Sequence, residues 1–250
     1  MSAWFDLAGR TPLAGNGVLR RLACHRPELH VWAVEPHAAC TLRAWIADSE
    51  RTQAERMLHA ERRRMFIAAR GALRMLLGHY LGCDALSLSI TRGPHGKPSL
   101  IAPAGAARLA FNVSHCEDRA LIALGVAGGV GVDIERADRK VDAALLARRC
   151  LSTAEQRRLE ARPGAQRAAR FLRYWTHKEA VAKALGAGLT LDFRTIEIDL
   201  DAPEQHVVVC DRTGRAEVEV FEVAVGASHH AAAAVCIQSD LDPAAAGTAS

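Results

Sequence analysis

Two acidic side chains stand two positions apart in the segment 130–135, which reads VGVDIE. The apolar residues alternate with the period of a β-strand, so Asp133 and Glu135 are expected on one face. Two converging carboxylates are oxygen ligands of the kind that Mg²⁺ accepts when phosphate and water complete its shell. Gly131, on the same face, would leave room for a bulky phosphorylated ligand. The alternative is a solvated strand face that carries two ordinary acids.

A second group of reactive side chains recurs every four residues in the segment 175–183, which reads WTHKEAVAK. Trp175, Glu179 and Lys183 would lie along one stripe of a helix. The alternative is an exposed Glu–Lys pair next to a core tryptophan. The chain has twenty-eight arginines and four lysines, yet Lys178 and Lys183 both fall in this segment. Because an ammonium can follow a phosphate and give up a proton, which guanidinium cannot, the segment favours phosphate chemistry.

Composition limits the class of protein and its partners. A chain of 250 residues with 50% hydrophobic and 24% charged residues is neither disordered nor fibrous. We expect no membrane span, since the longest uncharged apolar stretch, 120–132, is short and broken by glycine, and no secretory signal, since residues 1–20 lack a basic segment followed by a long apolar run. Seven cysteines without a Cys-x-x-Cys pair indicate free thiols in a reducing cytoplasm. The net charge of +4 suits an acidic protein or a phosphorylated ligand better than nucleic acid.

The elements that must position these residues form two α+β halves. Helical periodicity covers about 49–81, 141–150 and 165–185, and a capping box at 152–155 opens another helix. Gly82 and Gly186 would end the two long helices. Strands are expected at 29–34, 86–90, 109–114, 120–126, 130–135, 195–200, 207–210, 216–225 and 231–237, with a hairpin turn at 128–129. We place the N-terminal half at 1–128, with a loose arm over 1–28, the C-terminal half at 129–241, and a disordered tail at 242–250.

With these segments in view, the sequence resembles the 4'-phosphopantetheinyl transferases of the larger, two-half Sfp-like type. The family pattern is a strand Val/Ile-Gly-Val/Ile-Asp-x-Glu and, about forty residues later, Trp-x-x-Lys-Glu-x-x-x-Lys, as at 130–135 and 175–183. Three further segments match in order: the helix signature at 69–74, HGKP at 95–98 and FNVSH at 111–115. The resemblance covers about residues 48–190, and ordered motifs are more specific than any single one.

The resemblance implies two pseudo-twofold halves, each a helix packed on a small antiparallel sheet, with the active site between them. It implies a monomeric, cytoplasmic, Mg²⁺-dependent enzyme that transfers the 4'-phosphopantetheine arm of coenzyme A to a serine of an apo acyl or peptidyl carrier protein. Such transfer activates fatty-acid, polyketide or nonribosomal-peptide synthesis. A carrier protein is typically acidic, which fits the arginines at 56–74 and 148–173.

Residue roles follow from the matching positions. Asp133, Glu135 and Glu179 would hold Mg²⁺, and Glu179, Lys183 and Asp133 would be the catalytic residues. The residues implied in binding coenzyme A are Arg92, Gly96, Lys97, Pro98, Asn112, Ser114, His115, Lys178 and Lys183. The chain departs from the family at Gln53, where a basic residue usually grips the 3'-phosphate, so Arg51 or Arg56 would have to substitute.

Two other classes of function are compatible with parts of the sequence. The first is a non-catalytic module that binds a carrier protein or a nucleotide on a decayed transferase scaffold. A decayed site would not be expected to keep Asp133, Glu135, Glu179 and Lys183 together. The second is nucleic-acid binding through the arginines at 62–64, a triplet that we interpret as a solvated helix face.

Overall fold

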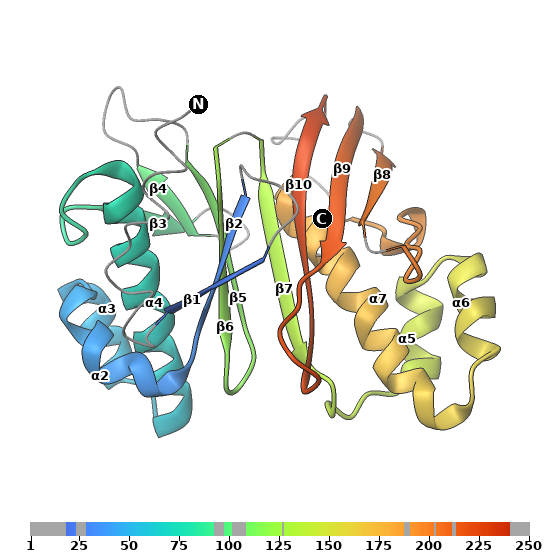
Figure 1. The fold of residues 1–250 in the computed structure, drawn as a ribbon, viewed down its shortest axis with the longest axis horizontal. Coiled ribbons are helices and arrows are strands. Elements are labelled where there is room, and N and C mark those ends of the chain that lie inside the picture. The colour runs from blue at the N-terminus through green and yellow to red at the C-terminus, as the bar shows by residue number, and fades with distance from the viewer. Residues whose placement is uncertain are drawn as a thin grey trace. The chain divides into compact units, whose positions relative to one another are not determined.

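A computed structural model describes residues 19–23, 29–92, 98–101, 109–126, 128–187, 191–202, 204–211 and 214–240, with Arg92 and Asp211 described by their backbone alone. The chain divides into two compact units, the first made of residues 1–109 and 113–126 and the second of residues 110–112 and 127–250. Each unit contains a long helix and an antiparallel sheet, as expected for an α+β fold with two halves (Figure 1).

The first unit is organised by the helix α4 (Ala60–Leu81), whose side toward the core is apolar. Its sheet has the order β1-β2-β6-β5. The strands are β1 (Leu19–Leu22), β2 (Leu29–Val34), β5 (Ala110–His115) and β6 (Ala120–Gly125). The unit also contains α2 (Ala39–Leu42), α3 (Asp48–Glu55), two 3-10 turns (Pro36–Ala38 and Arg43–Trp45) and the ribbon β3 (Ser89–Arg92) with β4 (Pro98–Ile101).

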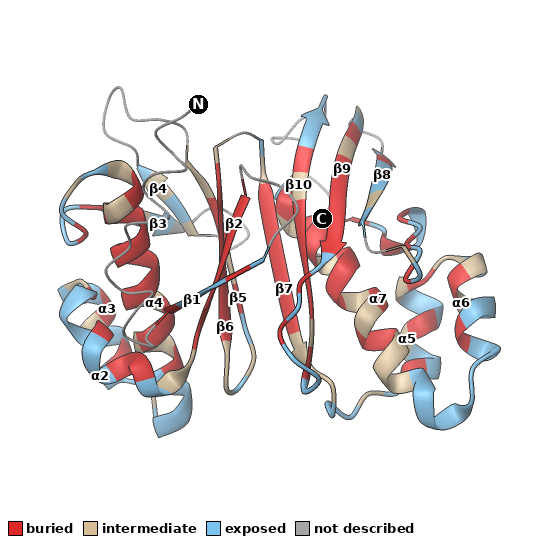
Figure 2. Ribbon diagram, viewed as in Figure 1, coloured by how far each residue is buried: buried red, intermediate tan, exposed pale blue. Residues whose placement is uncertain are grey.

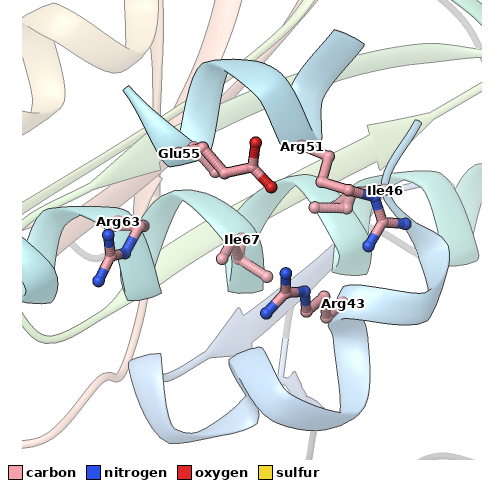
Figure 3. A pocket seen from close by; sticks show the side chains of 7 residues that line it. Arg43, Ile46, Arg51, Glu55, Arg63 and Ile67 are labelled. Carbon is pink, nitrogen blue, oxygen red and sulfur yellow. The ribbon is translucent and has the colours of Figure 1, made fainter. Parts of the chain in front are cut away.

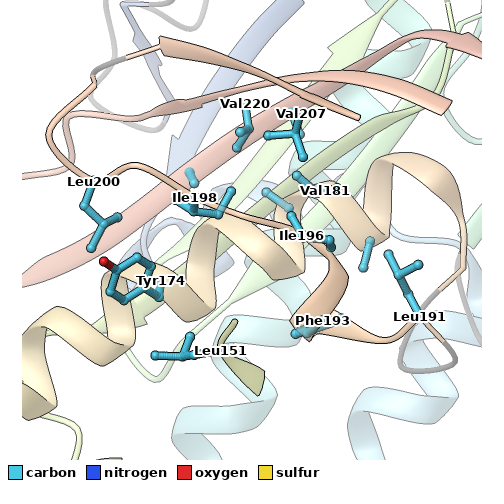
Figure 4. Close-up of a cluster of buried hydrophobic side chains, with 14 of the residues drawn as sticks. Leu151, Tyr174, Val181, Leu191, Phe193, Ile196, Ile198, Leu200, Val207 and Val220 are labelled. Carbon is cyan, nitrogen blue, oxygen red and sulfur yellow. The ribbon is translucent and has the colours of Figure 1, made fainter. Parts of the chain in front are cut away.

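The second unit packs the helix α7 (Gly164–Leu185) on a sheet with the order β7-β10-β9-β8. The strands are β7 (Val130–Arg136), β8 (Glu204–Asp211), β9 (Gly214–Glu222) and β10 (His229–Ser239). Two shorter helices, α5 (Ala143–Cys150) and α6 (Thr153–Glu160), lie next to α7. Apolar side chains from all three helices and from the sheet form one buried core (Figure 4). Figure 2 shows that β7 and the middle of α7 are largely buried.

Several sequence predictions are confirmed. The strand at 29–34 has the predicted bounds, and the Ser152–Glu155 capping box opens α6. Gly82 and Gly186 end the two long helices in the left-handed conformation, with φ of 65° and 72°. Among the described helices, none has the length and apolar content needed to cross a bilayer.

Five local predictions are wrong. The helix expected over 49–81 breaks at 56–59, because α3 folds back to place Glu50 against two arginines of α4. Residues 19–22 of the expected loose arm pair with β2, and the strand expected at 86–90 begins at Ser89. No hairpin forms at 128–129, since β6 pairs with β2 whereas β7 pairs with β10. The rest of the arm and the tail over 242–250 lie outside the described residues.

The fifth is the strand expected at 195–200, which starts as a 3-10 turn and continues as an extended segment without a ladder. Ile196, Ile198 and Leu200 are buried in the core, and the amide of Ile198 donates to Glu155 Oε1 over 2.8 Å. The alternation in the sequence therefore reflects burial in the core formed by the helices and the sheet, not pairing with another strand.

Candidate active site

Strand β7 and helix α7 bring the four principal candidate residues to one face of the second unit. Gly131, Asp133 and Glu135 alternate with the apolar positions of β7, which places them on one side of the strand. Glu179 and Lys183 lie one turn apart on α7, the helix that packs against β7. The strand and the helix together therefore assemble a set that is dispersed over fifty residues of sequence.

Gly131 allows this close approach of α7 to β7. A Cβ at this position would lie 1.9 Å from the carbonyl oxygen of Ala180 and 2.5 Å from the amide nitrogen of Ala184. Both distances are far below van der Waals contact, so only glycine fits. The prediction that Gly131 makes room for a ligand is therefore wrong, because the space is filled by the backbone of α7.

Lys183 is ion-paired with Asp133. Its Nζ lies 2.6 Å from Asp133 Oδ1 and donates to the carbonyl oxygen of Val132 over 3.2 Å. The side chain of Asp133 is 7% exposed, whereas that of Lys183 is 24% exposed. The ammonium therefore neutralises a buried carboxylate while still reaching solvent, a position from which it can also meet an anion.

Glu135 and Glu179 are carboxyl groups with raised pKa values. Burial raises the pKa of Glu179, and the negative charge of Asp133 raises it further. Burial likewise raises the pKa of Glu135, again with a contribution from Asp133, while Arg139 and a hydrogen bond from Trp175 oppose the rise. The negative charge of Asp133 therefore raises the pKa of both carboxyl groups. Carboxylate oxygens are the hard donors that Mg²⁺ prefers, although among the described residues the group with ligand atoms within 4.8 Å of one another is Cys116, Asp118 and His229, and not these three carboxylates.

Trp175 connects this set to the core. Its ring packs against Phe171 and Phe193, with ring centroids 6.3 Å and 5.6 Å apart. Trp175 therefore fills the core next to Glu135, whose pKa it lowers.

Lys178 does not face the site, and its predicted contact with phosphate is wrong. The side chain is fully buried, and its Nζ lies 2.6 Å from Glu155 Oε2. Two further bonds run to the carbonyl oxygens of Phe193, at 2.7 Å, and Ile196, at 2.5 Å. Three partners use all the N–H groups of an ammonium. Burial lowers the pKa of Lys178, while the charge of Glu155 raises it.

The first unit repeats this buried ion pair with arginine. Arg74 of α4 donates to Glu50 Oε2 over 2.6 Å, and also to the carbonyl oxygens of Ala85 and Leu88. Glu50 accepts the amide of Ala47 at the start of α3, as Glu155 accepts the amide of Ser152 at the start of α6. In both units a short helix, a long helix and the segment after the long helix are thus joined through one buried ion pair.

Asn112 supports β7 from β5. Its side chain is buried, and Oδ1 accepts the amide of Val132 over 3.0 Å. The predicted contact with coenzyme A is therefore replaced, for this oxygen, by a structural bond next to Asp133. In sequence, only the position of Asn112 within the FNVSH motif signals that it matters.

The remaining candidates for coenzyme A binding belong to the first unit. Ser114 is buried and His115 is exposed at the end of β5. Pro98 opens β4 and Arg92 ends β3. Gly96 and Lys97 lie outside the described residues.

Arg51 lines a basic pocket that the sequence motifs do not indicate. The pocket, of about 180 Å³, also contains Arg43 and Arg63, with Glu55 as an acidic residue (Figure 3). Arg43 comes from the turn before α3, Arg51 from α3 and Arg63 from α4, so the pocket exists only once these elements fold together. Arg56 is exposed at the end of α3 and does not line this pocket.

Comparison with known proteins gives this site its context. Residues 129–236 match the family model of the 4'-phosphopantetheinyl transferase superfamily, and residues 30–126 match that of a 4'-phosphopantetheinyl transferase N-terminal region. The chain is 35% identical to the 4'-phosphopantetheinyl transferase HetI of Nostoc sp. over 181 residues, which are 71% of this chain and 76% of HetI. The chain belongs to the 4'-phosphopantetheinyl transferase superfamily.

Other transferases are similar over different lengths. A putative 4'-phosphopantetheinyl transferase of Synechocystis sp. is 35% identical over 147 residues, 59% of each chain. The 4'-phosphopantetheinyl transferase of Bacillus subtilis is 26% identical over 194 residues, 74% of this chain and 84% of that protein. The transferase described here is thus similar to its relatives across both units, and its fold agrees with the two-half type.

Proposed function

We propose that this transferase moves the 4'-phosphopantetheine arm of coenzyme A onto a serine of an apo carrier protein at the site formed by β7 and α7. Membership of the superfamily supports the reaction class, and the observation that carries the site is the set of three carboxylates with Lys183 beside it. In this proposal Asp133, Glu135 and Glu179 hold Mg²⁺. When bound, Mg²⁺ would polarise the phosphorus centre and stabilise the leaving bisphosphate.

The side chains of α7 supply the proton chemistry. Glu179 orients the incoming serine hydroxyl and accepts its proton, directly or through water. The serine oxygen forms a bond to phosphorus while the bond to the oxygen of adenosine 3',5'-bisphosphate breaks. Lys183, on the next turn, neutralises or protonates that leaving oxygen. Positioning and charge neutralisation carry most of such a phosphoryl transfer.

Coenzyme A binding is assigned to the first unit. We place the 3'-phosphate at the pocket that contains Arg51, because three arginines there can surround a doubly charged group. The proposed contacts of the 3'-phosphate thus include Arg43 and Arg63 besides Arg51, whereas the sequence indicated only Arg51 or Arg56. Arg92, Gly96, Lys97, Pro98, Ser114 and His115 remain the other proposed contacts. We further propose that the enzyme acts as a monomer in the cytoplasm.

Mass spectrometry tests this function. The protein is incubated with coenzyme A, Mg²⁺ and a panel of apo carrier proteins from fatty-acid and secondary-metabolite synthases, and the mass of each carrier is measured. We expect a gain of one phosphopantetheine on at least one carrier, and a loss of this gain when EDTA replaces Mg²⁺. No gain on any carrier would refute the proposal and favour a binding module without catalysis.

A further inference from the structure

Glu135 is held by an arginine of the turn that follows β7. Arg139 lies four residues further along the chain, and its Nη1 forms an ion pair with Glu135 Oε1. The turn is closed by the amide of Arg139, which donates to the carbonyl oxygen of Arg136 over 3.2 Å. The side chain of Arg136 bonds to Asp138 within the same turn. The backbone of the turn thus places the guanidinium of Arg139 on one of the proposed metal ligands.

Two of the three proposed metal ligands are therefore paired with cations of this chain. Lys183 is paired with Asp133 and Arg139 with Glu135, whereas no basic side chain among the described residues forms an ion pair with Glu179. The ligand atoms of the three carboxylates do not all lie within 4.8 Å of one another. Each ion pair directs a carboxylate oxygen toward its own cation. For all three carboxylates to meet one ion, at least one of these pairs has to open.

Arg139 is the cation that is better placed to leave. Its side chain is 49% exposed, against 24% for that of Lys183. Lys183 also donates to the carbonyl oxygen of Val132, whereas Glu135 is the one bonded partner of the Arg139 side chain among the described residues. A half-exposed guanidinium gives up an ion pair at little cost in free energy, because water replaces the carboxylate.

The balance of charge also favours the departure of Arg139. Burial raises the pKa of Glu135, and the charges of Arg139 and Lys183 oppose this rise, so both cations act on this carboxylate. A divalent cation together with Lys183 would balance the three negative charges. A guanidinium kept at Glu135 would leave one positive charge in excess and would repel the metal ion. Arg139 and a divalent cation therefore compete for the same carboxylate.

We propose that Arg139 is a positioning residue that holds Glu135 until a divalent cation binds, and that the cation then displaces it. This inference rests on the proposed function, because it takes Asp133, Glu135 and Glu179 as the metal ligands. On displacement the guanidinium turns to solvent and Glu135 turns to the metal ion. Arg139 thus keeps Glu135 in place before the ion arrives and lowers the affinity of the site for divalent cations.

Binding of Mn²⁺ tests this competition without turnover, because the electron paramagnetic resonance signal reports the free ion. Mn²⁺ is the probe since it accepts the same oxygen ligands as Mg²⁺. It is titrated into the wild type, Arg139→Gln and Arg139→Lys, each with and without coenzyme A. We expect Arg139→Gln to lower the dissociation constant for Mn²⁺ about fivefold. Arg139→Lys retains the charge and should stay within about twofold of the wild type.

Lys140→Gln is the matched control. Lys140 is the next residue in the chain, is exposed, and has no ion-pair partner among the described residues. Its replacement removes the same charge from the same turn region and should leave the dissociation constant for Mn²⁺ within about twofold of the wild-type value. An equal decrease for Lys140→Gln would refute the inference, since the effect would then come from net charge and not from competition at Glu135.

A further variant, Asp133→Asn, separates this inference from the function on which it rests. If the wild type binds no Mn²⁺ even with coenzyme A, or if Asp133→Asn binds it as tightly as the wild type, the proposed metal site fails and the inference fails with it. If Asp133→Asn weakens binding but Arg139→Gln keeps the wild-type dissociation constant, only the competition at Glu135 is refuted. A lower thermal unfolding temperature of Arg139→Gln without tighter Mn²⁺ binding would likewise refute it, because Arg139 would then be merely structural.

Discussion

Lys178 and Glu179 are neighbours in sequence and have opposite environments. Successive residues of a helix point about 100° apart, so one side chain faces the core and the other faces β7. Lys178 is buried against Glu155, whereas Glu179 is partly exposed near Asp133. At the scale of single residues, the helix therefore separates a structural lysine from a proposed catalytic glutamate.

The proposed roles of Asp133 and Glu179 give the first prediction. Glu179→Gln removes the proposed base and one metal ligand, and Asp133→Ala removes the ligand that Lys183 neutralises. We expect each change to lower the rate of phosphopantetheine transfer by at least about 100-fold, with the circular dichroism spectrum of the wild type retained. Glu160→Gln, at an exposed position of α6, serves as the control. Full activity in both variants would refute the metal and base assignments.

At the scale of elements, the buried pair of Lys178 and Glu155 yields a stability prediction. Lys178→Met leaves Glu155 buried without its cation, which should lower the free energy of unfolding by about 3–5 kcal/mol. The double variant Lys178→Met/Glu155→Gln should recover part of this loss, because a neutral amide needs no counter-charge. Urea unfolding measures the free energy of unfolding of the single and the double variant. A loss below about 1 kcal/mol for Lys178→Met would contradict the buried pair as a structural connection.

The contact between β7 and α7 yields a second stability prediction. Gly131→Ala would place a methyl group 1.9 Å from the carbonyl oxygen of Ala180, which forces the helix away from the strand. We expect a loss of at least about 2 kcal/mol in the free energy of unfolding, together with a loss of transfer activity. Gly164→Ala is the matched control, since a Cβ at Gly164 meets nothing within 4 Å. Equal stability of the two variants would contradict the close approach.

At the scale of the whole molecule, acid should destabilise the protein. Burial lowers the pKa of both His177 and His230, so their folded-state values lie below the ordinary value of about 6.5. The unfolded chain then binds more protons in acid. The stabilisation from neutral imidazoles is complete above that ordinary value and is lost as the pH falls below it.

Unfolding free energies measured by urea across this pH range test the effect. We expect His177→Gln to flatten the decrease below about pH 6.5, whereas His37→Gln, at a histidine whose side chain is 68% exposed, should leave it unchanged. A profile for His177→Gln as steep as that of the wild type would exclude His177 as a source of the pH dependence.

The sequence predicts the glycine ends of the two long helices, most strands, the α+β class and the motif residues on β7 and α7. These features depend on periodicity and on local backbone chemistry, which neighbouring residues encode. It could not predict the strand pairing around 128–129, because the partner β10 lies about a hundred residues away. The segment 195–200 alternates like a strand for a related reason: its apolar residues are buried in a core built from distant helices and strands.

Tertiary structure alone decided how the motif residues divide their roles. Lys178 is a buried counter-ion of Glu155, Gly131 admits the backbone of α7, and Asn112 holds β7. The arginines around Arg51 meet in a pocket only after α3 folds back on α4. Residue type and spacing predict which groups can do chemistry. Whether a given group faces a ligand, the core or another backbone depends on packing between distant segments, and a short motif does not contain that information.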